Sequence, residues 1–292
     1  MRNWFIFGAG FSGIEIGRQL AATGAPVAGT TRNEAKFEIL HAAGLEALRF
    51  DGQLDAALTG RLSAATHLII SIGPDHSGDP LVPQHGAALS AAMPNLKWIG
   101  YLSTVGVYGD HEGAWVEETT PCRPASGRSI VRLKSEAAWQ AFADSKTVPI
   151  AILRLSGIYG PGRNTFCNLA DGSAKRLIKK GQVFNRIHVE DIAGAARFLA
   201  SRKLGGIFNI TDDEPAPPQD VVTFAAEMMG VSPPPELDYD SVILSPMARS
   251  FYGEVKRVSN VKLKSAGYAL RYPEYRSALA ALWEDGSWRD GR

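Results

Sequence analysis

Three glycines near the start of the chain have the spacing of a phosphate-binding turn. Gly8, Gly10 and Gly13 form the pattern Gly-x-Gly-x-x-Gly between an apolar run and a helical pattern. The first glycine of such a turn permits a tight bend, the second lets the backbone approach a phosphate, and the third lets helix and strand pack closely. The N-terminus of the helix then favours an anion. The pattern predicts a dinucleotide site to which Phe11 and Ser12 also belong, and the strand–helix context favours it over a glycine turn without a ligand.

The residues after the second apolar run bear on which dinucleotide binds. An NAD site usually has Asp or Glu about 20 residues beyond the glycines, where it binds the ribose hydroxyls. This chain has Thr31 and Arg32 there, and no carboxylate before Glu34. A guanidinium binds a 2′-phosphate through charge-assisted hydrogen bonds. The sequence therefore favours NADP, with NAD as the alternative cofactor and a solvated Arg32 as the other explanation of this residue.

Few other residues are spaced for chemistry. Cys122 and Cys167 are far apart and lack the spacing of metal ligands, so free thiols in a reducing compartment are expected. His188 could act as an acid near neutral pH, but a capping or packing role before the following helix is simpler. The acidic segment 110–112 follows a glycine and resembles an exposed turn, so no metal site is expected. The absence of a Gly-x-Ser-x-Gly elbow and of a Gly-Lys-Ser/Thr loop argues against α/β-hydrolases and P-loop NTPases.

The elements that must position these residues alternate along the first half of the chain. Apolar runs separated by helical patterns predict a parallel sheet of repeated strand–helix units, and continuously apolar strands are typical of burial on both faces. The expected strands are 4–7, 25–29, 45–50, 67–71, 98–102 and 150–155, and the expected helices include 14–23 and 135–143.

The last third is rich in glycine and proline, although a helix over 191–200 and a strand over 207–210 indicate a return to the sheet. The predicted fold class is α/β, a Rossmann doubly wound parallel sheet with a smaller C-terminal substrate-binding lobe. Residues 1–162, with 186–212 returning, are expected to form the NAD(P)-binding domain. Residues 163–185 and 213–292 are expected to form the lobe.

Composition narrows the class of partner. The 292 residues are 45% hydrophobic and 21% charged, and 31 Lys+Arg against 30 Asp+Glu leave a net charge of +1. This balance gives no electrostatic footprint for nucleic acid or an anionic membrane. Neither a signal-peptide pattern nor an apolar run of about 18 residues occurs. We therefore expect a cytoplasmic protein whose partners are a dinucleotide and a small-molecule substrate.

Several motifs in order resemble the short-chain dehydrogenase/reductase superfamily, in particular its extended, NAD-dependent epimerase/dehydratase branch. They are the glycine turn, 50–52, 102–109, 153–162, 187–193 and 208–213. The resemblance implies that Asp51 and Gly52 lie at the adenine, and that either Ser103 or Thr104 occupies the catalytic Ser/Thr position near the nicotinamide. It further implies that the cofactor is lined by Ser71, Ile72, Gly73, Leu155 and Ser156. The substrate cleft would include Tyr108, Tyr159, Arg163 and His188. A homodimer is the suggested assembly.

The family's Tyr-x-x-x-Lys pair is missing. In the family the Tyr passes a proton and the Lys lowers its pKa, and the spacing puts both on one helical face. Alignment on Glu136 places Arg132 at the Lys position and Arg128 at the Tyr position. Arg132 could hold a ribose or phosphate and Arg128 an anionic substrate group, but arginine donates no proton near neutral pH. The chain thus resembles an atypical subgroup of the superfamily. Tyr108 is the first candidate for a substitute proton donor, and Tyr159 is the second. The simpler interpretation of each is a buried tyrosine whose hydroxyl has a hydrogen-bond partner.

Two functions remain open from the sequence. The first is an NADP(H)-dependent oxidoreductase or epimerase/dehydratase-like enzyme acting on a small polar or sugar-derived substrate. The second is a non-catalytic NADP(H)-binding sensor, because binding survives the loss of the proton machinery. A scaffold that no longer binds a cofactor is a third explanation, which the complete glycine motif disfavours.

Overall fold

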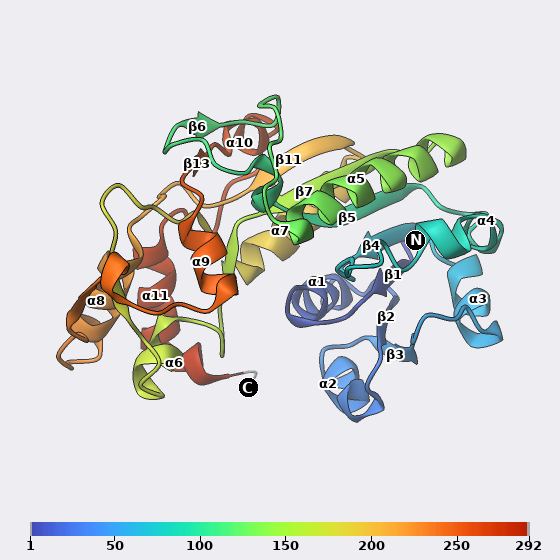
Figure 1. Cartoon of the computed structure of the whole chain (residues 1–292). Helices are drawn as coiled ribbons and strands as arrows, with labels where there is room; N and C mark the ends of the chain where they lie inside the picture. Colours follow the sequence, from blue (N-terminus) through green and yellow to red (C-terminus); the bar gives the residue numbers. More distant parts are fainter. Residues whose placement is uncertain (1, 291–292) are drawn as a thin grey trace. The chain divides into compact units, whose positions relative to one another are not determined.

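The computed structural model describes residues 2–290 (Figure 1). The chain divides into two compact units. The first unit runs up to Val107 and includes Gly127–Arg154 and Ile192–Phe208, and the second comprises Tyr108–Ser126, Leu155–Asp191 and the segment from Asn209 onward. The domain boundaries drawn from the sequence stay a prediction.

The first unit is built on a seven-stranded sheet with the order β11-β7-β5-β4-β1-β2-β3. The pairs formed by β1 with β2 and β4, by β2 with β3, and by β4 with β5 are parallel. This sheet confirms the predicted doubly wound α/β class. Its strands are β1 Trp4–Phe7, β2 Val27–Thr31, β3 Glu46–Arg49, β4 His67–Ile70, β5 Trp98–Thr104, β7 Ile150–Leu155 and β11 Gly206–Ile210.

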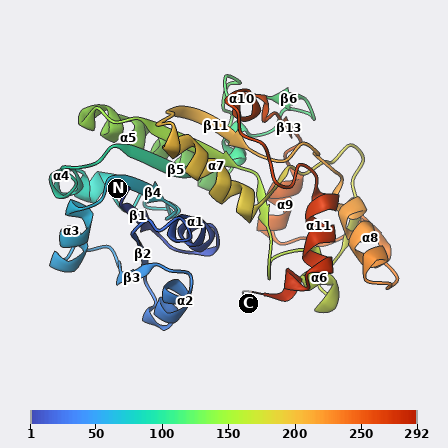
Figure 2. The same ribbon diagram turned by 180° about the vertical axis from the view of Figure 1, so that it is seen from behind.

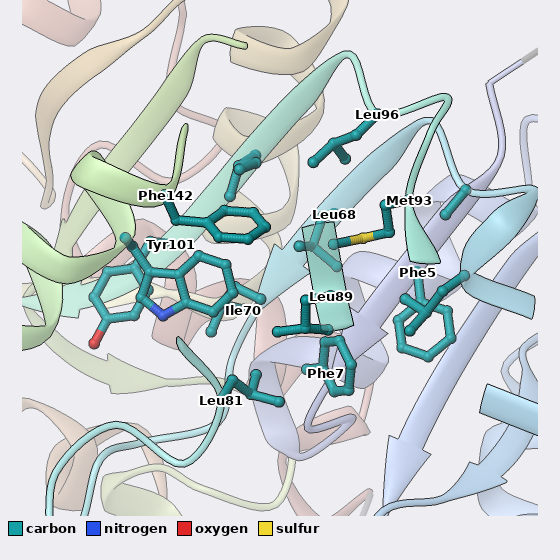
Figure 3. Close-up of a cluster of buried hydrophobic side chains, with 14 of the residues drawn as sticks. Phe5, Phe7, Leu68, Ile70, Leu81, Leu89, Met93, Leu96, Tyr101 and Phe142 are labelled. Atoms are coloured by element: carbon teal, nitrogen blue, oxygen red, sulfur yellow. The ribbon is translucent and has the colours of Figure 1, made fainter. Parts of the chain in front are cut away.

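Helices cover both faces of this sheet. The row α3–α4–α5 packs side by side on one face, and α1 and α7 lie on the other (Figures 1 and 2). Figure 3 shows the core under α4 and α5, where Phe7, Leu68, Ile70 and Leu89 are fully buried. All four residues of both β1 and β4 are buried, as expected of strands covered on both faces. The helices are α1 Phe11–Ala21, α2 Phe37–Ala42, α3 Ala56–Ser63, α4 Val82–Ala92, α5 Gly127–Lys146 and α7 Val189–Ser201.

Helix α5 begins eight residues before the helix expected from the sequence at residue 135. In the segment 127–134, which the sequence did not predict as helix, the buried position is the polar Ser129. Polar residues on the buried face of a helix remove the apolar periodicity by which its N-terminal half would be recognised. Glu136, further along α5, is buried as well and accepts a hydrogen bond from Ser103.

The second unit contains short elements around a separate core. Three two-stranded sheets pair β8 with β10, β9 with β12, and β6 with β13, all in parallel. Phe166, Ala225, Tyr275 and Leu279 are buried in its core. Between residues 2 and 290, no helix combines the length and the apolar character that crossing a bilayer requires. The elements are β6 Trp115–Val116, β8 Gly157–Tyr159, α6 Thr165–Ala170, β9 Arg176–Ile178, β10 Arg186–His188, α8 Pro218–Met228, β12 Glu236–Asp238, α9 Pro246–Tyr252, β13 Arg257–Val258, α10 Val261–Ser265 and α11 Tyr275–Glu284.

Candidate dinucleotide-binding site

The turn between β1 and α1 accepts only glycine at Gly8. This residue has φ +83°, and a Cβ added there would lie 2.6 Å from Ile72 Cγ1 and 2.8 Å from the Ile72 backbone nitrogen. The turn is also tied to β2, because Gly8 N donates to Thr30 Oγ1 at 2.9 Å and Ala9 N donates to Thr30 O at 2.7 Å. Left-handed backbone and close contact with Ile72 both require a residue without a side chain.

Gly10 and Gly13 serve different purposes. A Cβ at Gly13 would lie 2.7 Å from Gly8 O, so this glycine permits the close packing of α1 on the turn. A Cβ at Gly10 would meet nothing within 4 Å. Gly10 is the N-cap of α1, no side chain caps it, and the first turn holds no acidic residue. The open space therefore lies at the positive end of the helix, where an anion such as the pyrophosphate of a dinucleotide is favoured.

At the end of β2, the exposed side chain of Arg32 follows Thr31. Arg49, the last residue of β3, is paired in register with Thr31. Its guanidinium lies 3.4 Å from Glu34 Oε1 and 3.1 Å from Asp51 Oδ2, so Asp51, predicted at the adenine, is held in an ion pair. Arg49 was not among the site residues predicted from the sequence. Its position at the end of a predicted strand neighbouring Arg32 was the signal that could have found it.

Other predicted cofactor residues lie where β1 and β4 end. Ser71 N and Ile72 N both donate to Phe7 O, at 2.9 and 3.1 Å. The Gly52 carbonyl accepts from His85 Nε2 at 2.7 Å. These bonds fix the backbones of the segments that follow β3 and β4 within the first unit.

Arg132 joins this edge from α5. Its Nη1 donates to the Leu102 carbonyl at 3.0 Å, and a Cβ added to Gly73 would lie 3.1 Å from its Nη2. The guanidinium therefore reaches the ends of both β4 and β5, at the position that the alignment gave to the family's Lys. Arg128, one turn earlier on α5, is exposed.

The structure distinguishes Ser103 from Thr104. Ser103 Oγ donates to Glu136 Oε1 at 2.5 Å, and Glu136 is held by Arg154 through Nε at 3.2 Å and Nη2 at 2.8 Å. All three residues are at most 4% exposed, so the Ser103 hydroxyl belongs to a buried ion-pair network. Thr104 is partly exposed. Its Oγ1 accepts a hydrogen bond from the Gly106 N–H at 3.1 Å, and within residues 2–290 the structure shows no other hydrogen bond to this hydroxyl. Thr104 is therefore the better candidate for contact with a substrate.

Tyr108 lies in the second unit, and its hydroxyl has a structural partner. The side chain is fully buried, and the hydroxyl donates to Asn209 Oδ1 at 2.7 Å. This bond ties the segment after β5 to the end of β11. It argues against the proton-donor role predicted for Tyr108 and supports the simpler interpretation of a satisfied, buried tyrosine.

Tyr159 and His188 contact each other within the second unit. They are register partners on β8 and β10, and their rings meet edge to face with centroids 5.4 Å apart. Burial lowers the pKa of His188 to about 4, with a further contribution from Arg271, and burial raises the pKa of Tyr159. His188 Nδ1 accepts the Glu190 N–H at 3.3 Å at the start of α7. His188 is thus neutral at pH 7 and fits the capping explanation better than an acid.

The remaining predicted residues of the second unit are positioned by their backbones. Ser156 N donates to Ile210 O at 3.1 Å, and Leu155 ends β7. Arg163 N donates to Gly160 O at 3.1 Å in a tight turn. Their proximity to a cofactor or substrate stays a prediction. In the part of the chain that the structure describes, no three His, Cys, Asp or Glu side chains are grouped as a metal would require.

The sheet and its glycine turn define a dinucleotide-binding protein of the Rossmann class, and comparisons with known proteins agree. Residues 87–211 match the model of the NAD dependent epimerase/dehydratase family. Protein YeeZ of Escherichia coli (strain K12) is 31% identical over 247 residues, which cover 80% of this chain and 86% of that protein. The chain belongs to this NAD(P)-binding epimerase/dehydratase family.

Solved structures show the same architecture. The structure of a functionally unknown conserved protein from Silicibacter pomeroyi has 44% identity and a TM-score of 0.89, with 98% of this chain and 99% of that chain covered. The human epimerase family protein SDR39U1, solved with NADPH, has 16% identity and a TM-score of 0.74, with 97% and 99% covered. At that identity the human protein shows the fold alone.

Proposed function

We propose that the chain is an NADP(H)-dependent oxidoreductase or epimerase-like enzyme that acts on a small polar, sugar-derived substrate. The observation that carries this proposal is the open space at Gly10 in front of α1. The space lies in the same unit as Arg32 and Arg132, two cations suited to the phosphate and ribose of one dinucleotide.

Each group of the first unit has a role in this proposal. The glycine turn and α1 hold the pyrophosphate, Arg32 binds the 2′-phosphate, and Arg132 holds the nicotinamide ribose in place of the family's Lys. A bound nicotinamide supplies or accepts the hydride. Thr104 donates a hydrogen bond to the substrate oxygen and positions it, since the Ser103 hydroxyl is engaged with Glu136. A water molecule gives this oxygen its proton when the substrate is reduced and takes the proton up when the substrate is oxidised. The exposed guanidinium of Arg128 binds an anionic group of the substrate.

Calorimetric titration with NADPH, NADP, NADH and NAD tests the cofactor assignment. Tight binding of the phosphorylated pair, weakened in Arg32→Ala, is expected. Hydride exchange is then sought across carbonyl compounds and sugar nucleotides, with Thr104→Ala compared against wild type. Binding of no nucleotide would overturn the proposal, and so would the absence of hydride exchange across the whole panel.

A non-catalytic NADP(H) sensor is the second candidate, and one observation favours it. Arg128 occupies the family's Tyr position and the Tyr108 hydroxyl is bonded to Asn209, so neither provides a titrating proton donor. A sensor must change its oligomeric state or partner affinity with the redox state of the nucleotide. Light scattering of the apo, NADP-bound and NADPH-bound forms measures the oligomeric state. Identical behaviour of all three forms would exclude the sensor function.

A further inference from the structure

Arg49 presents a second exposed cation close to the one predicted to bind the 2′-phosphate. Because β2 and β3 are parallel and Arg49 pairs in register with Thr31, its backbone lies beside the residue that precedes Arg32. Its guanidinium bridges Glu34 and Asp51, and the three side chains are 56%, 63% and 50% exposed. The group is therefore accessible to an anion arriving from solvent.

We propose that Arg49 is a specificity-determining residue that binds the 2′-phosphate of NADP(H) together with Arg32, and that Glu34 holds Arg49 when no phosphate is present. This inference rests on the proposed NADP(H) function. A phosphate monoester carries about two negative charges near pH 7, more than the single charge of Arg32 balances. Glu34 and Asp51 would also repel that phosphate unless a cation lay between them and the ligand.

The energetics favour exchange of partners. Exposed ion pairs contribute little to stability, so releasing Arg49 from Glu34 costs little. A phosphate can accept two parallel hydrogen bonds from the planar guanidinium and carries more charge than one carboxylate. Arg49 therefore gains more from the phosphate than it loses from Glu34.

The same arrangement gives NAD no comparable gain, because NAD lacks the phosphate that would attract Arg49. A carboxylate near the end of β2 is the usual partner of the free ribose hydroxyls of NAD. Here the first carboxylate, Glu34, is paired with Arg49. The next charged residues along the chain, Lys36 and Glu38, carry opposite charges and leave the local charge balance unchanged.

Calorimetric titration of Arg49→Ala with NADPH, NADH and 2′,5′-ADP tests the inference without an activity readout. We expect a loss of about tenfold or more in affinity for NADPH and 2′,5′-ADP, the effect of one charge-assisted contact, and a change of less than about twofold for NADH. Glu34→Gln is expected to bind NADPH more tightly than wild type does. Arg49→Lys is expected to bind NADPH more tightly than Arg49→Ala but less tightly than wild type. Arg18→Ala is the matched control, because Arg18 is similarly exposed (54%) and paired with Glu15 on α1.

The outcomes separate this inference from the proposed function. Unchanged NADPH binding by Arg49→Ala, while Arg32→Ala is impaired, would overturn the role of Arg49 alone. An equal loss for NADH and NADPH would also overturn it, because Arg49 would then support the adenosine or the fold. If wild type binds no dinucleotide, both proposals fall. Glu34→Gln and Arg49→Lys keep the test decisive if Arg49→Ala does not fold.

Discussion

Alanine substitutions at Gly8 and Gly10 should separate folding from cofactor binding. The two residues are two positions apart in one turn, yet a methyl group meets opposite surroundings at each. At Gly8 it would lie 2.8 Å from the Ile72 backbone nitrogen, in a backbone with φ +83°. At Gly10 it would meet no atom within 4 Å.

The expected losses in the free energy of unfolding follow from these surroundings. A left-handed conformation costs alanine about 1–2 kcal/mol, and overpacking against Ile72 adds about 1–3 kcal/mol. Gly8→Ala should therefore lose roughly 2–5 kcal/mol, a large part of the stability of an ordinary domain. Gly10→Ala should lose about 1 kcal/mol or less, since alanine is only a poorer N-cap than glycine.

The methyl group of Gly10→Ala should instead occupy the space predicted for the pyrophosphate. Affinity for the dinucleotide should fall at least about tenfold, equivalent to about 1.4 kcal/mol. Urea unfolding of the apo proteins and calorimetric titration with NADPH measure the two effects separately. The reasoning is refuted if Gly10→Ala is destabilised as strongly as Gly8→Ala, or if it binds NADPH like wild type.

Three further predictions follow from buried or reactive groups. Because burial lowers the pKa of His188 from 6.5 to about 4, this residue binds fewer protons in the folded than in the unfolded state between these values. Its contribution to stability should therefore fall by up to about 3 kcal/mol as the pH drops from 6.5 towards 4. The difference in stability between wild type and His188→Gln measures this contribution, and a difference that does not change with pH over this range would contradict it. Glu136→Gln should lose about 3–5 kcal/mol in urea unfolding, because it leaves the Arg154 charge buried without its carboxylate, and a loss below 1 kcal/mol would disprove this account. Once a substrate is found, Thr104→Ala should lower kcat by about tenfold or more with little change in stability. Ser103→Ala should mainly lower the free energy of unfolding, by about 1.5–3 kcal/mol, because it removes the bond to Glu136. If Ser103→Ala instead lowers kcat and Thr104→Ala instead lowers stability, Ser103 is the residue that contacts the substrate.

Local sequence patterns were sufficient to predict the sheet and the glycine turn. A strand such as Trp4–Phe7 is continuously apolar because both of its faces are buried, so the pattern depends little on distant residues. The spacing of Gly8, Gly10 and Gly13 likewise reflects constraints within one turn and the helix that follows it. Their separate purposes, tight packing at Gly13 and open space at Gly10, are visible only in three dimensions.

Tertiary structure decided which polar residues are available for chemistry. Ser103 and Thr104 are adjacent hydroxyls in the sequence, but only Ser103 points to the buried Glu136, which lies 33 residues away along the chain. Tyr108 likewise meets Asn209, 101 residues distant. Arg49 comes to lie beside Thr31 because β2 and β3 pair in parallel. A sequence specifies the side chains that can make hydrogen bonds or ion pairs, but folding determines which partners they meet, because those partners come from distant segments.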